Sequence, residues 1–298
     1  MVFNGILNID KPAGITSQTA VTRVKHLLGV KKAGHSGTLD PLATGVLPVM
    51  VGTAVKASDW LTGHDKRYIA GIRLGVETDS EDITGRILYE HKGALPSFEE
   101  FCSAVQSFTG RILQIPPMYS AIKKDGKKLV DLARKGISVE RAPREIEIYS
   151  ITASSVGGEL YLDVFCSKGT YIRTLCADIG RELGCGAAMS SLRRTAAGCF
   201  SIENSIPLDQ LSNIPPEEIA TLLTPTEHIF CDYEKITLPP FYERLFKNGA
   251  SVSFSKIGID TISKDGLYRV YDENSFFALA ETVIYEGLPA LKVKKFFK

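Results

Sequence analysis

Residues 34–45 concentrate side chains that could carry out chemistry. Within twelve residues this segment holds three glycines, one proline, His35 and the carboxylate Asp40. Such a density of turn-forming residues is typical of a shaped loop and not of a helix or strand. An aspartate on a rigid loop can act in catalysis, but it can equally form a turn or cap a helix. The residues alone therefore mark Asp40 and His35 as candidates without naming a reaction.

The sequence lacks the motifs of common cofactors. No Lys-Ser/Thr pair follows the glycines of residues 34–45, so the segment is not a phosphate-binding P-loop. Thr38 stands where a nucleophile elbow needs glycine. The triplet Gly184-Cys185-Gly186 lacks the third glycine of a dinucleotide fingerprint, because residue 189 is Met. We find no sign of a nucleotide cofactor.

Cysteine spacing and hydropathy indicate a reducing, aqueous compartment. None of the six cysteines forms a Cys-x-x-Cys pair, so neither a zinc site nor a disulfide framework is expected. No apolar run reaches the roughly 18 residues that a membrane span needs. Residues 1–10 also lack the basic and apolar regions of a signal peptide. We expect a cytoplasmic protein that binds neither a metal nor a membrane.

Charge is divided unevenly along a chain whose formal net charge is only +1. Residues 111–144 hold nine basic and three acidic residues, a local balance of +6. Acidic residues gather instead in residues 77–100 and 203–235. A basic segment is often only a solvated surface, but this density makes binding of a polyanion an equally good interpretation.

Helices and strands are expected on both sides of the candidate loop. Apolar periodicity predicts helices over 17–28, 98–109 and 172–183 and strands over 67–75 and 160–166. Thr16 or Ser17 can cap the first helix, and Ser97 with Glu100 forms a capping box for the second. Arg173 lies one position off the apolar stripe of the third helix, so we expect it to border the core.

The C-terminal part of the chain differs from the rest in composition and in expected secondary structure. The acidic, proline-rich stretch 207–240 is interpreted as a helical tail that runs into a linker. Strand candidates follow over 251–254, 267–272, 276–283 and 290–297, with turns at Asp265-Gly266 and Glu286-Gly287. They predict a small all-β barrel.

A family resemblance extends this interpretation. Residues 34–45 resemble the signature of the TruB-type pseudouridine synthases, in which Gly-His-(Thr/Ser)-Gly-Thr-Leu-Asp-Pro-Leu-Ala-(Thr/Ser)-Gly surrounds the catalytic aspartate. Further segments resemble family motifs in the family's order, namely residues 8–14, 66–68, 167–174 and 192–195. Residues 116–128 resemble the insertion with which the stand-alone bacterial branch grips tRNA. This insertion coincides with the +6 segment.

The resemblance implies the fold and its domains. We expect an α+β pseudouridine-synthase fold with a central, mainly antiparallel sheet flanked by helices, followed by a small PUA-like β-barrel. The catalytic domain is expected over residues 1–231, with the basic RNA-gripping insertion at about 111–144. The PUA-like RNA-binding domain is expected over residues 232–298.

The resemblance also implies a reaction, the isomerisation of uridine to pseudouridine at position 55 in the T-arm of tRNA. The N1-glycosidic bond breaks, the uracil turns, and C5 bonds to the ribose. The base must first leave its stack. The reaction needs no cofactor and no metal, and the expected partner is tRNA, bound by a monomer.

Three residues are expected to be catalytic. By resemblance, Asp40 acts on the nucleotide, and attack at C1′, addition at C6 and a glycal route all stay open. A carboxylate in a dry pocket needs a cation to stay ionised, so Arg173 is expected to pair with Asp40 through two hydrogen bonds. Tyr68 is expected to stack on the flipped uracil and could share proton removal at C5.

Other residues are expected to bind the substrate. His35 is expected to occupy the space that the uridine vacates, and Lys11 to reach a phosphate or to brace the pocket. Tyr171 is expected beside Arg173, and Leu192 as an apolar wall under the base. The expected RNA-gripping lysines are Lys123, Lys124, Lys127 and Lys128. A tRNA-folding chaperone and a guide-RNA-dependent synthase remain the alternative functions.

Overall fold

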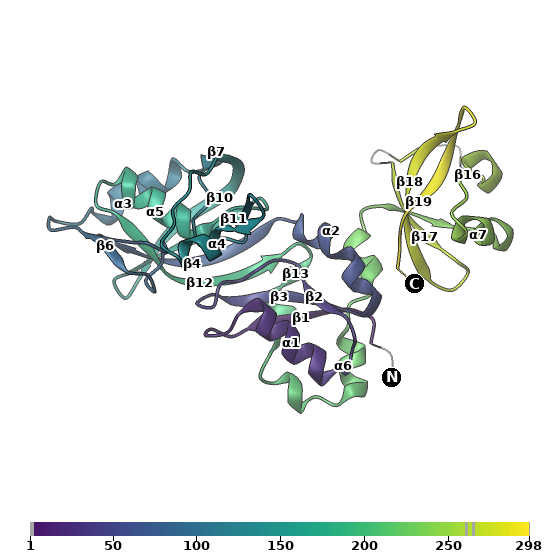
Figure 1. Ribbon diagram of the computed structural model, residues 1–298, viewed down its shortest axis with the longest axis horizontal. Helices are drawn as coiled ribbons and strands as arrows, with labels where there is room; N and C mark the ends of the chain where they lie inside the picture. The colour runs from purple at the N-terminus through teal and green to yellow at the C-terminus, as the bar shows by residue number, and fades with distance from the viewer. Residues whose placement is uncertain (1–2, 260–261, 264–265, 298) are drawn as a thin grey trace.

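The computed structural model of the protein describes residues 3–259, 262–263 and 266–297 and contains two principal β-sheets (Figure 1). A ten-stranded sheet is built from residues 5–207, and a five-stranded sheet lies at the C-terminal end. Helices are interspersed among the strands along the whole chain. The predicted α+β class with a C-terminal β-domain is confirmed.

The large sheet is mainly antiparallel, as predicted. Its strands are β1 (Gly5–Lys11), β2 (Ala33–His35), β3 (Thr44–Val51), β4 (Lys66–Leu74), β7 (Gly110–Gln114), β10 (Arg144–Val156), β11 (Glu159–Cys166), β12 (Ala187–Ala197), β13 (Phe200–Ser201) and β14 (Ile206–Pro207). They lie in the order β14-β1-β3-β12-β4-β11-β10-β7, with β2 on β3 and β13 on β12. Within the described part of this sheet, β1 with β14 and β3 with β12 are the parallel pairs.

Three helices cover one face of this sheet, and their starts and stops follow the predicted signals. They are α1 (Ser17–Leu27), α3 (Phe98–Gln106) and α5 (Ile172–Glu182). The Thr16 hydroxyl accepts the Thr19 N–H and caps α1, and Ser97 and Glu100 form the capping box of α3. Apolar side chains of these helices join those of the strands in one continuous core.

Two irregular segments rise from this sheet. In one, β5 (Val76–Thr78) and β6 (Ile87–Glu90) form a hairpin whose loop, residues 79–86, returns to β12 through hydrogen bonds of Glu81 and Ile83 with Met189. The other is the basic segment, which forms the short hairpin β8 (Lys123–Lys124) and β9 (Lys127–Lys128) and the helix α4 (Leu129–Ala133). Both segments flank the candidate loop.

The small sheet curls into a half-barrel. Its strands lie in the order β15 (Glu234–Thr237), β17 (Leu267–Tyr271), β18 (Phe276–Tyr285), β19 (Leu288–Phe296) and β16 (Val252–Ser253). The four strand candidates of the sequence correspond to β16–β19, and the Glu286-Gly287 turn is confirmed. Of the other predicted turn, Asp265 lies outside the described residues. The region is not all-β, because α7 (Pro240–Lys247) packs beside the sheet (Figure 1).

The expected helical tail is mostly irregular. Residues 207–240 contain one short α-helix, α6 (Pro216–Leu222), between 3-10 turns and strand ends. Pro215 and Pro225 each stand directly before a new helical turn, and because a proline cannot continue a preceding helix, the stretch is divided into short pieces. The domain boundary at residue 231 stays a prediction.

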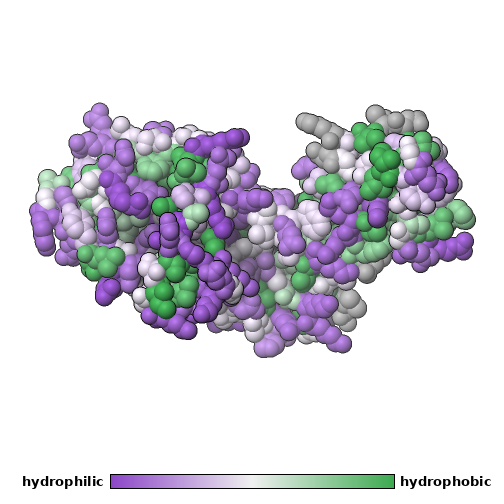
Figure 2. Space-filling view, turned by 45° about the horizontal axis from the view of Figure 1, so that its top comes forward, coloured by the Kyte–Doolittle hydropathy of each residue, from purple (hydrophilic) through white to green (hydrophobic). Residues whose placement is uncertain are grey.

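Aromatic side chains join the two sheets. Phe230 packs edge-on against Trp60, with ring centroids 5.6 Å apart, and lies 5.5 Å from Phe297. Their cluster includes Met50 of the large sheet and Leu279 of the small one. On the face shown in Figure 2, polar residues predominate and apolar residues form separate patches on both lobes. No helix in the described part of the chain has the length and apolarity to span a bilayer.

Candidate active site

Asp40 lies on the loop that joins β2 to β3. The Asp40 carbonyl accepts the Ala43 N–H at 3.0 Å, and the Pro41 carbonyl accepts the Gly14 N–H at 2.8 Å. Where the loop enters β3, Gly45 has φ +102°, and a Cβ there would lie 2.2 Å from the Arg194 carbonyl oxygen. The close pairing of β3 with β12 thus requires glycine. The dense glycines of the sequence do mark a shaped loop.

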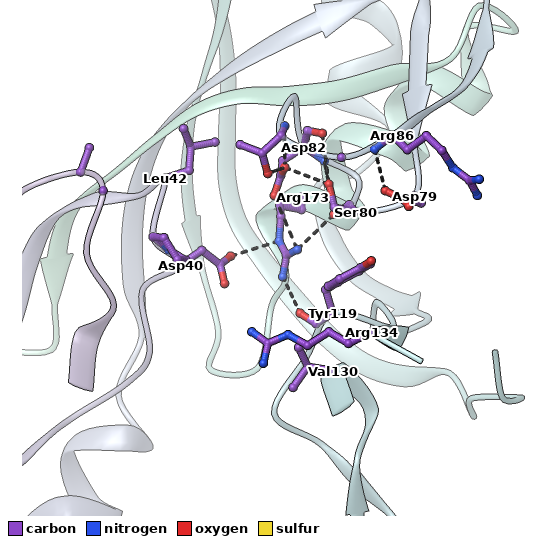
Figure 3. Close-up of a pocket in the computed structure, with 15 residues that line it drawn as sticks. Asp40, Leu42, Asp79, Ser80, Asp82, Arg86, Tyr119, Val130, Arg134 and Arg173 are labelled. Atoms are coloured by element: carbon purple, nitrogen blue, oxygen red, sulfur yellow. Dashed lines mark hydrogen bonds and ion pairs between the residues drawn. The ribbon is translucent and has the colours of Figure 1, made fainter. Parts of the chain in front are cut away.

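A cavity of about 660 Å³ opens beside Asp40 (Figure 3). Three segments that are distant in sequence form its walls: the loop around Gly14, the 79–86 loop, and the basic segment with Tyr119, Val130 and Arg134. Asp40 and Arg173 lie between these segments. The cavity is therefore closed by the basic segment on one side, although most of that segment faces solvent.

Arg173 connects these walls. Its side chain comes from the first turn of α5 and is only 6% exposed. Nε lies 3.1 Å from Asp40 Oδ2, while Nη1 donates to the Ser80 carbonyl at 3.0 Å and Nη2 to the Tyr119 carbonyl at 2.7 Å. The pairing with Asp40 is confirmed, but the predicted two-bond geometry is wrong because main-chain oxygens occupy both terminal nitrogens. Arg173 is also buried instead of bordering the core.

A second carboxylate, Asp82, faces the same guanidinium. Asp82 is buried, and its Oδ2 lies 3.7 Å from Arg173 Nη1. Its Oδ1 accepts the Thr84 N–H and the Ser80 hydroxyl, each at 2.9 Å. Asp82 was not predicted as a site residue, because in the sequence it is one of many acidic residues in 77–100. The run Asp82-Ile83-Thr84-Gly85, typical of an Asx turn, was the available signal.

The environment of Asp40 raises its pKa above the ordinary value. Burial is the largest cause, and the neighbouring Asp82 carboxylate adds to it. The charges of Arg173 and Lys11 act in the opposite direction and favour the ionised form, but burial outweighs them. The side chain still has 36% of its surface exposed, and the cavity lies beside it. The ionised carboxylate is thus a stronger base and nucleophile than one in water.

Arg194 is a buried cation that contacts the loop carrying Asp40. It is 1% exposed, and its Nε donates to the Val46 carbonyl at 2.7 Å and its Nη2 to the Gly37 carbonyl at 3.2 Å. It also hydrogen-bonds to Tyr68. No role was predicted for Arg194 from the sequence. Because side chains alternate along a strand, one of the adjacent Arg193 and Arg194 had to face the core, and that was the available signal.

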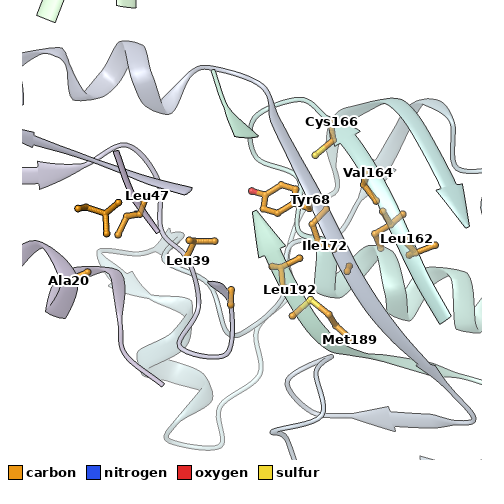
Figure 4. Close-up of a cluster of buried hydrophobic side chains, with 14 of the residues drawn as sticks. Ala20, Leu39, Leu47, Tyr68, Leu162, Val164, Cys166, Ile172, Met189 and Leu192 are labelled. Carbon is orange, nitrogen blue, oxygen red and sulfur yellow. The ribbon is translucent and has the colours of Figure 1, made fainter. Parts of the chain in front are cut away.

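Tyr68 and Leu192 lie together on neighbouring strands (Figure 4). Both belong to the main core cluster, which also contains Leu39. Burial raises the pKa of Tyr68 above 10.0, although the hydrogen bond from Arg194 favours the phenolate. The ring is thus a neutral, nearly enclosed surface. That is compatible with stacking and less favourable for proton removal by Tyr68.

Lys11 is enclosed and braces the chain. Its Nζ donates to the carbonyls of Pro12 and Ile15, both at 2.8 Å, and its side chain is fully buried. These contacts favour the alternative in which Lys11 braces the pocket over the one in which it reaches a phosphate. Burial is the largest cause that lowers the pKa of Lys11 to about 8.

His35 and Tyr171 come from different elements of the fold. His35 ends β2, and its Nδ1 accepts the Gly37 N–H at 3.3 Å. Burial, with the Arg194 charge, lowers the pKa of His35, so the ring is neutral at pH 7. Tyr171 precedes α5, and its main-chain N–H and C=O both bond to the Gln114 side chain, at 2.8 and 3.0 Å.

The four predicted RNA-gripping lysines are exposed on a hairpin. Lys123 pairs with Lys128 and Lys124 with Lys127 across a turn in which Asp125 and Gly126 have positive φ. Lys124 Nζ donates to the Glu140 carbonyl at 2.7 Å. Lys123, Lys127 and Lys128 line a second cavity of about 650 Å³, which shares Arg134 with the cavity beside Asp40.

The residues around Asp40 do not resemble a metal centre. Within the described ranges, no group of three or more His, Cys, Asp or Glu side chains could hold a metal ion. The site instead offers one partly exposed carboxylate, buried cations and a neutral aromatic ring.

The chain matches known family models and relatives over most of its length. Residues 25–172 match the TruB family pseudouridylate synthase (N-terminal domain) model, and residues 173–230 match the tRNA pseudouridylate synthase B C-terminal domain model. A tRNA pseudouridine synthase B of Clostridium tetani is 44% identical over 98% of this chain and 99% of its own length. Another, of Alkaliphilus oremlandii, is 46% identical over 87% and 86% of the two chains.

Solved structures agree with this result. A Cbf5-Nop10-Gar1 complex contains a chain that is 28% identical, with a TM-score of 0.74 over 99% of this chain and 85% of that chain. An H/ACA RNP bound to a substrate RNA containing 2′-deoxyuridine gives 26% identity and a TM-score of 0.71, over 99% and 85% of the two chains. The protein therefore belongs to the TruB family of pseudouridylate synthases, and it is an enzyme that isomerises uridine to pseudouridine.

Proposed function

We propose that the substrate is tRNA and that the target is uridine 55 of the T-arm. One observation carries the proposal: the Asp40–Arg173 pair lies beside a cavity whose outer wall belongs to the +6 segment. A basic segment is suited to holding RNA phosphates while a flipped base occupies the cavity. Relatives named tRNA pseudouridine synthase B support the choice of tRNA.

Asp40 starts the reaction as a carboxylate. Its raised pKa means that a fraction is protonated under mildly acidic conditions, and that fraction is inactive. Arg173 holds the carboxylate from one side only, which leaves Oδ1 without a partner among the described residues. Asp40 then attacks C1′, adds to C6 or assists a glycal route, so that the N1 bond breaks and C5 bonds to the ribose.

The enclosed residues complete the site. Tyr68 and Leu192 supply the apolar surface against which the uracil turns, and the neutral His35 fills the space that the uridine leaves. Tyr171 stands at the N-cap of α5, two residues before Arg173. Lys123, Lys124, Lys127 and Lys128 hold phosphates at a distance from the reacting base. We assign the protein to the cytoplasm, where its tRNA substrate is found. We further propose that it acts as a monomer and without a cofactor.

The decisive test uses an unmodified tRNA transcript without any added RNA. Purified protein should form pseudouridine at position 55 and at no other uridine, as mapped by carbodiimide labelling and reverse transcription. Asp40→Asn should form none, while its Kd for tRNA stays within about threefold because the change is isosteric. Turnover by Asp40→Asn refutes the role of Asp40. Product only after addition of a guide RNA supports the guide-dependent alternative.

The role of the lysines has its own test. Each neutralised phosphate contributes about −0.9 to the slope of log K against log salt for a duplex. Replacing Lys123, Lys124, Lys127 and Lys128 by Gln should therefore weaken tRNA binding and reduce the slope by about 2 to 4. An unchanged slope contradicts an RNA-gripping role for this hairpin.

A further inference from the structure

Helix α1 begins directly beside the catalytic loop, and its first residue touches that loop. Ser17 Oγ accepts the Leu39 N–H at 2.7 Å and donates to the Leu39 carbonyl at 2.9 Å. Ser17 is 1% exposed, and Leu39 is also buried. Leu39 is the residue immediately before Asp40. One hydroxyl thus holds both main-chain groups next to the catalytic carboxylate.

Ser17 is the partner on which Leu39 depends. Within the part of the chain that the structure describes, neither the Leu39 N–H nor its carbonyl has a second hydrogen-bond partner. A buried main-chain group without a partner is costly, so the loop would have to move if the hydroxyl were absent. The Ser17 hydroxyl therefore stabilises the loop in the one conformation in which both main-chain groups of Leu39 are hydrogen-bonded.

The same loop is held at two other points. Arg194 Nη2 donates to the Gly37 carbonyl at 3.2 Å, and the Gly14 N–H donates to the Pro41 carbonyl at 2.8 Å. These contacts lie three residues before and one residue after Asp40. Ser17 acts between them, from the start of a helix whose apolar face is packed into the main core. Of the three contacts, only that of Ser17 holds both the N–H and the C=O of one residue.

We infer that Ser17 is a positioning residue for Asp40. Its hydroxyl fixes the main chain at Leu39, so that the carboxylate stays beside Arg173 and directed at the reacting nucleotide. Ser17 itself is too enclosed to touch RNA. Misplacement of a reacting group by about 1 Å can cost 100-fold in rate. The inference rests on the proposed function, because it concerns the chemical step that Asp40 starts.

The test compares variants that differ in the hydroxyl alone. Ser17→Thr keeps the hydroxyl, while Ser17→Val has the shape of threonine without it. Ser17→Ala serves where the added methyl group of both prevents folding. Thr16→Ala is the matched control, since the Thr16 hydroxyl caps the same helix, and its hydrogen bonds among the described residues go to Thr19 and not to the loop. For each variant we would measure single-turnover conversion of a T-arm stem-loop, the Kd for tRNA, and hydrogen exchange of the Leu39 amide.

The expected result is a loss of rate without a loss of binding. Ser17→Val and Ser17→Ala should convert the stem-loop about 10- to 100-fold more slowly, with Kd within twofold of the original protein and faster exchange at Leu39. Ser17→Thr should recover most of the rate, and Thr16→Ala should stay within about twofold.

Two results overturn the inference. The first is a Ser17→Ala protein that converts at the original rate. The second is a loss of rate in Thr16→Ala equal to that in Ser17→Ala, because loosening of the helix would then explain both. Failure of the unmodified protein to convert the stem-loop refutes the proposed function instead, and Leu39 exchange still reports on the contact.

Discussion

Replacement of Arg194 by methionine tests the view that a buried cation supports the catalytic loop. Methionine has similar length and no charge, so it fills the space without donating hydrogen bonds. Arg194 is 1% exposed and donates to the carbonyls of Val46 and Gly37 and to Tyr68. The variant therefore removes three hydrogen bonds at once while leaving the packing nearly intact.

The size of the effect follows from the two carbonyl oxygens that lose their partner. Each buried acceptor left unsatisfied costs about 1–3 kcal/mol. Removal of a buried charge offsets part of this cost, because methionine needs no hydration. We expect the free energy of unfolding to fall by about 2–4 kcal/mol, a large share of the roughly 5–15 kcal/mol that stabilises a typical domain.

The charge of Arg194 also affects the pKa of His35, which can be measured separately from stability. Burial is the largest cause of the lowered pKa of His35, and the positive charge of Arg194 lowers it further. Loss of that charge should raise the pKa of His35 towards, but not to, its ordinary value of 6.5. NMR titration of the His35 ring protons measures this shift directly.

Two control variants separate charge from hydrogen bonding. Arg194→Lys keeps a positive charge and loses the fork of donors, so stability should fall while the pKa of His35 stays low. Arg193→Met changes the neighbouring residue, whose partly exposed guanidinium pairs with Asp10 at 2.8 Å. Its effect should stay below about 1 kcal/mol, as for other exposed ion pairs.

Urea unfolding of the three variants measures how much each substitution lowers the free energy of unfolding. A change of less than about 1 kcal/mol in Arg194→Met, similar to that in Arg193→Met, refutes the view that Arg194 supports the loop. An unchanged His35 pKa in Arg194→Met refutes the electrostatic part alone. Where Arg194→Met does not fold, Arg194→Lys still supplies the stability comparison.

For two further substitutions the structure predicts the direction of the effect. Asp82→Asn removes a charge that raises the pKa of Asp40, so the acidic limb of the pH–rate profile should move to lower pH. The value of kcat should fall, because Arg173 loses a charged partner that lies 3.7 Å away. A limb that moves to higher pH contradicts this reasoning. Gly45→Ala should lower the free energy of unfolding by about 3 kcal/mol or more, because its Cβ would meet the Arg194 carbonyl at 2.2 Å. Gly14→Ala, with positive φ and free space, should cost only about 1–2 kcal/mol; equal losses would exclude the clash.

Local signals in the sequence predicted local structure well. The caps of α1 and α3 and the apolar stripe of α5 are short-range features, and each helix begins where its capping or apolar signal indicates. The irregular stretch 207–240 was misjudged because its prolines start new helical turns at short intervals and so divide it into short pieces. β15 was missed for a different reason, since its pairing partner β17 follows more than 30 residues later.

The site was predictable only where one segment carried it. Residues 34–45 identified Asp40, but Asp82 and Arg194 reach it from β5–β6 and β12, and their proximity depends on strand order. β12 lies between β3 and β4, although it follows both by more than 100 residues. Periodicity predicts which face a side chain takes, and it does not predict which strand lies next to it.

The structure divides the basic segment into two parts with different consequences. Lys123, Lys127 and Lys128 line a cavity other than the one beside Asp40, so in the proposed function they would act on the affinity for RNA through long-range charge. The Tyr119 carbonyl of the same segment accepts from Arg173 Nη2 at 2.7 Å, and Arg173 Nε faces Asp40 at 3.1 Å. A displacement at Tyr119 thus reaches the catalytic carboxylate through one side chain. The charge count of the sequence predicts the basic lysine hairpin, whereas the contact between Tyr119 and Arg173 is visible only in the fold.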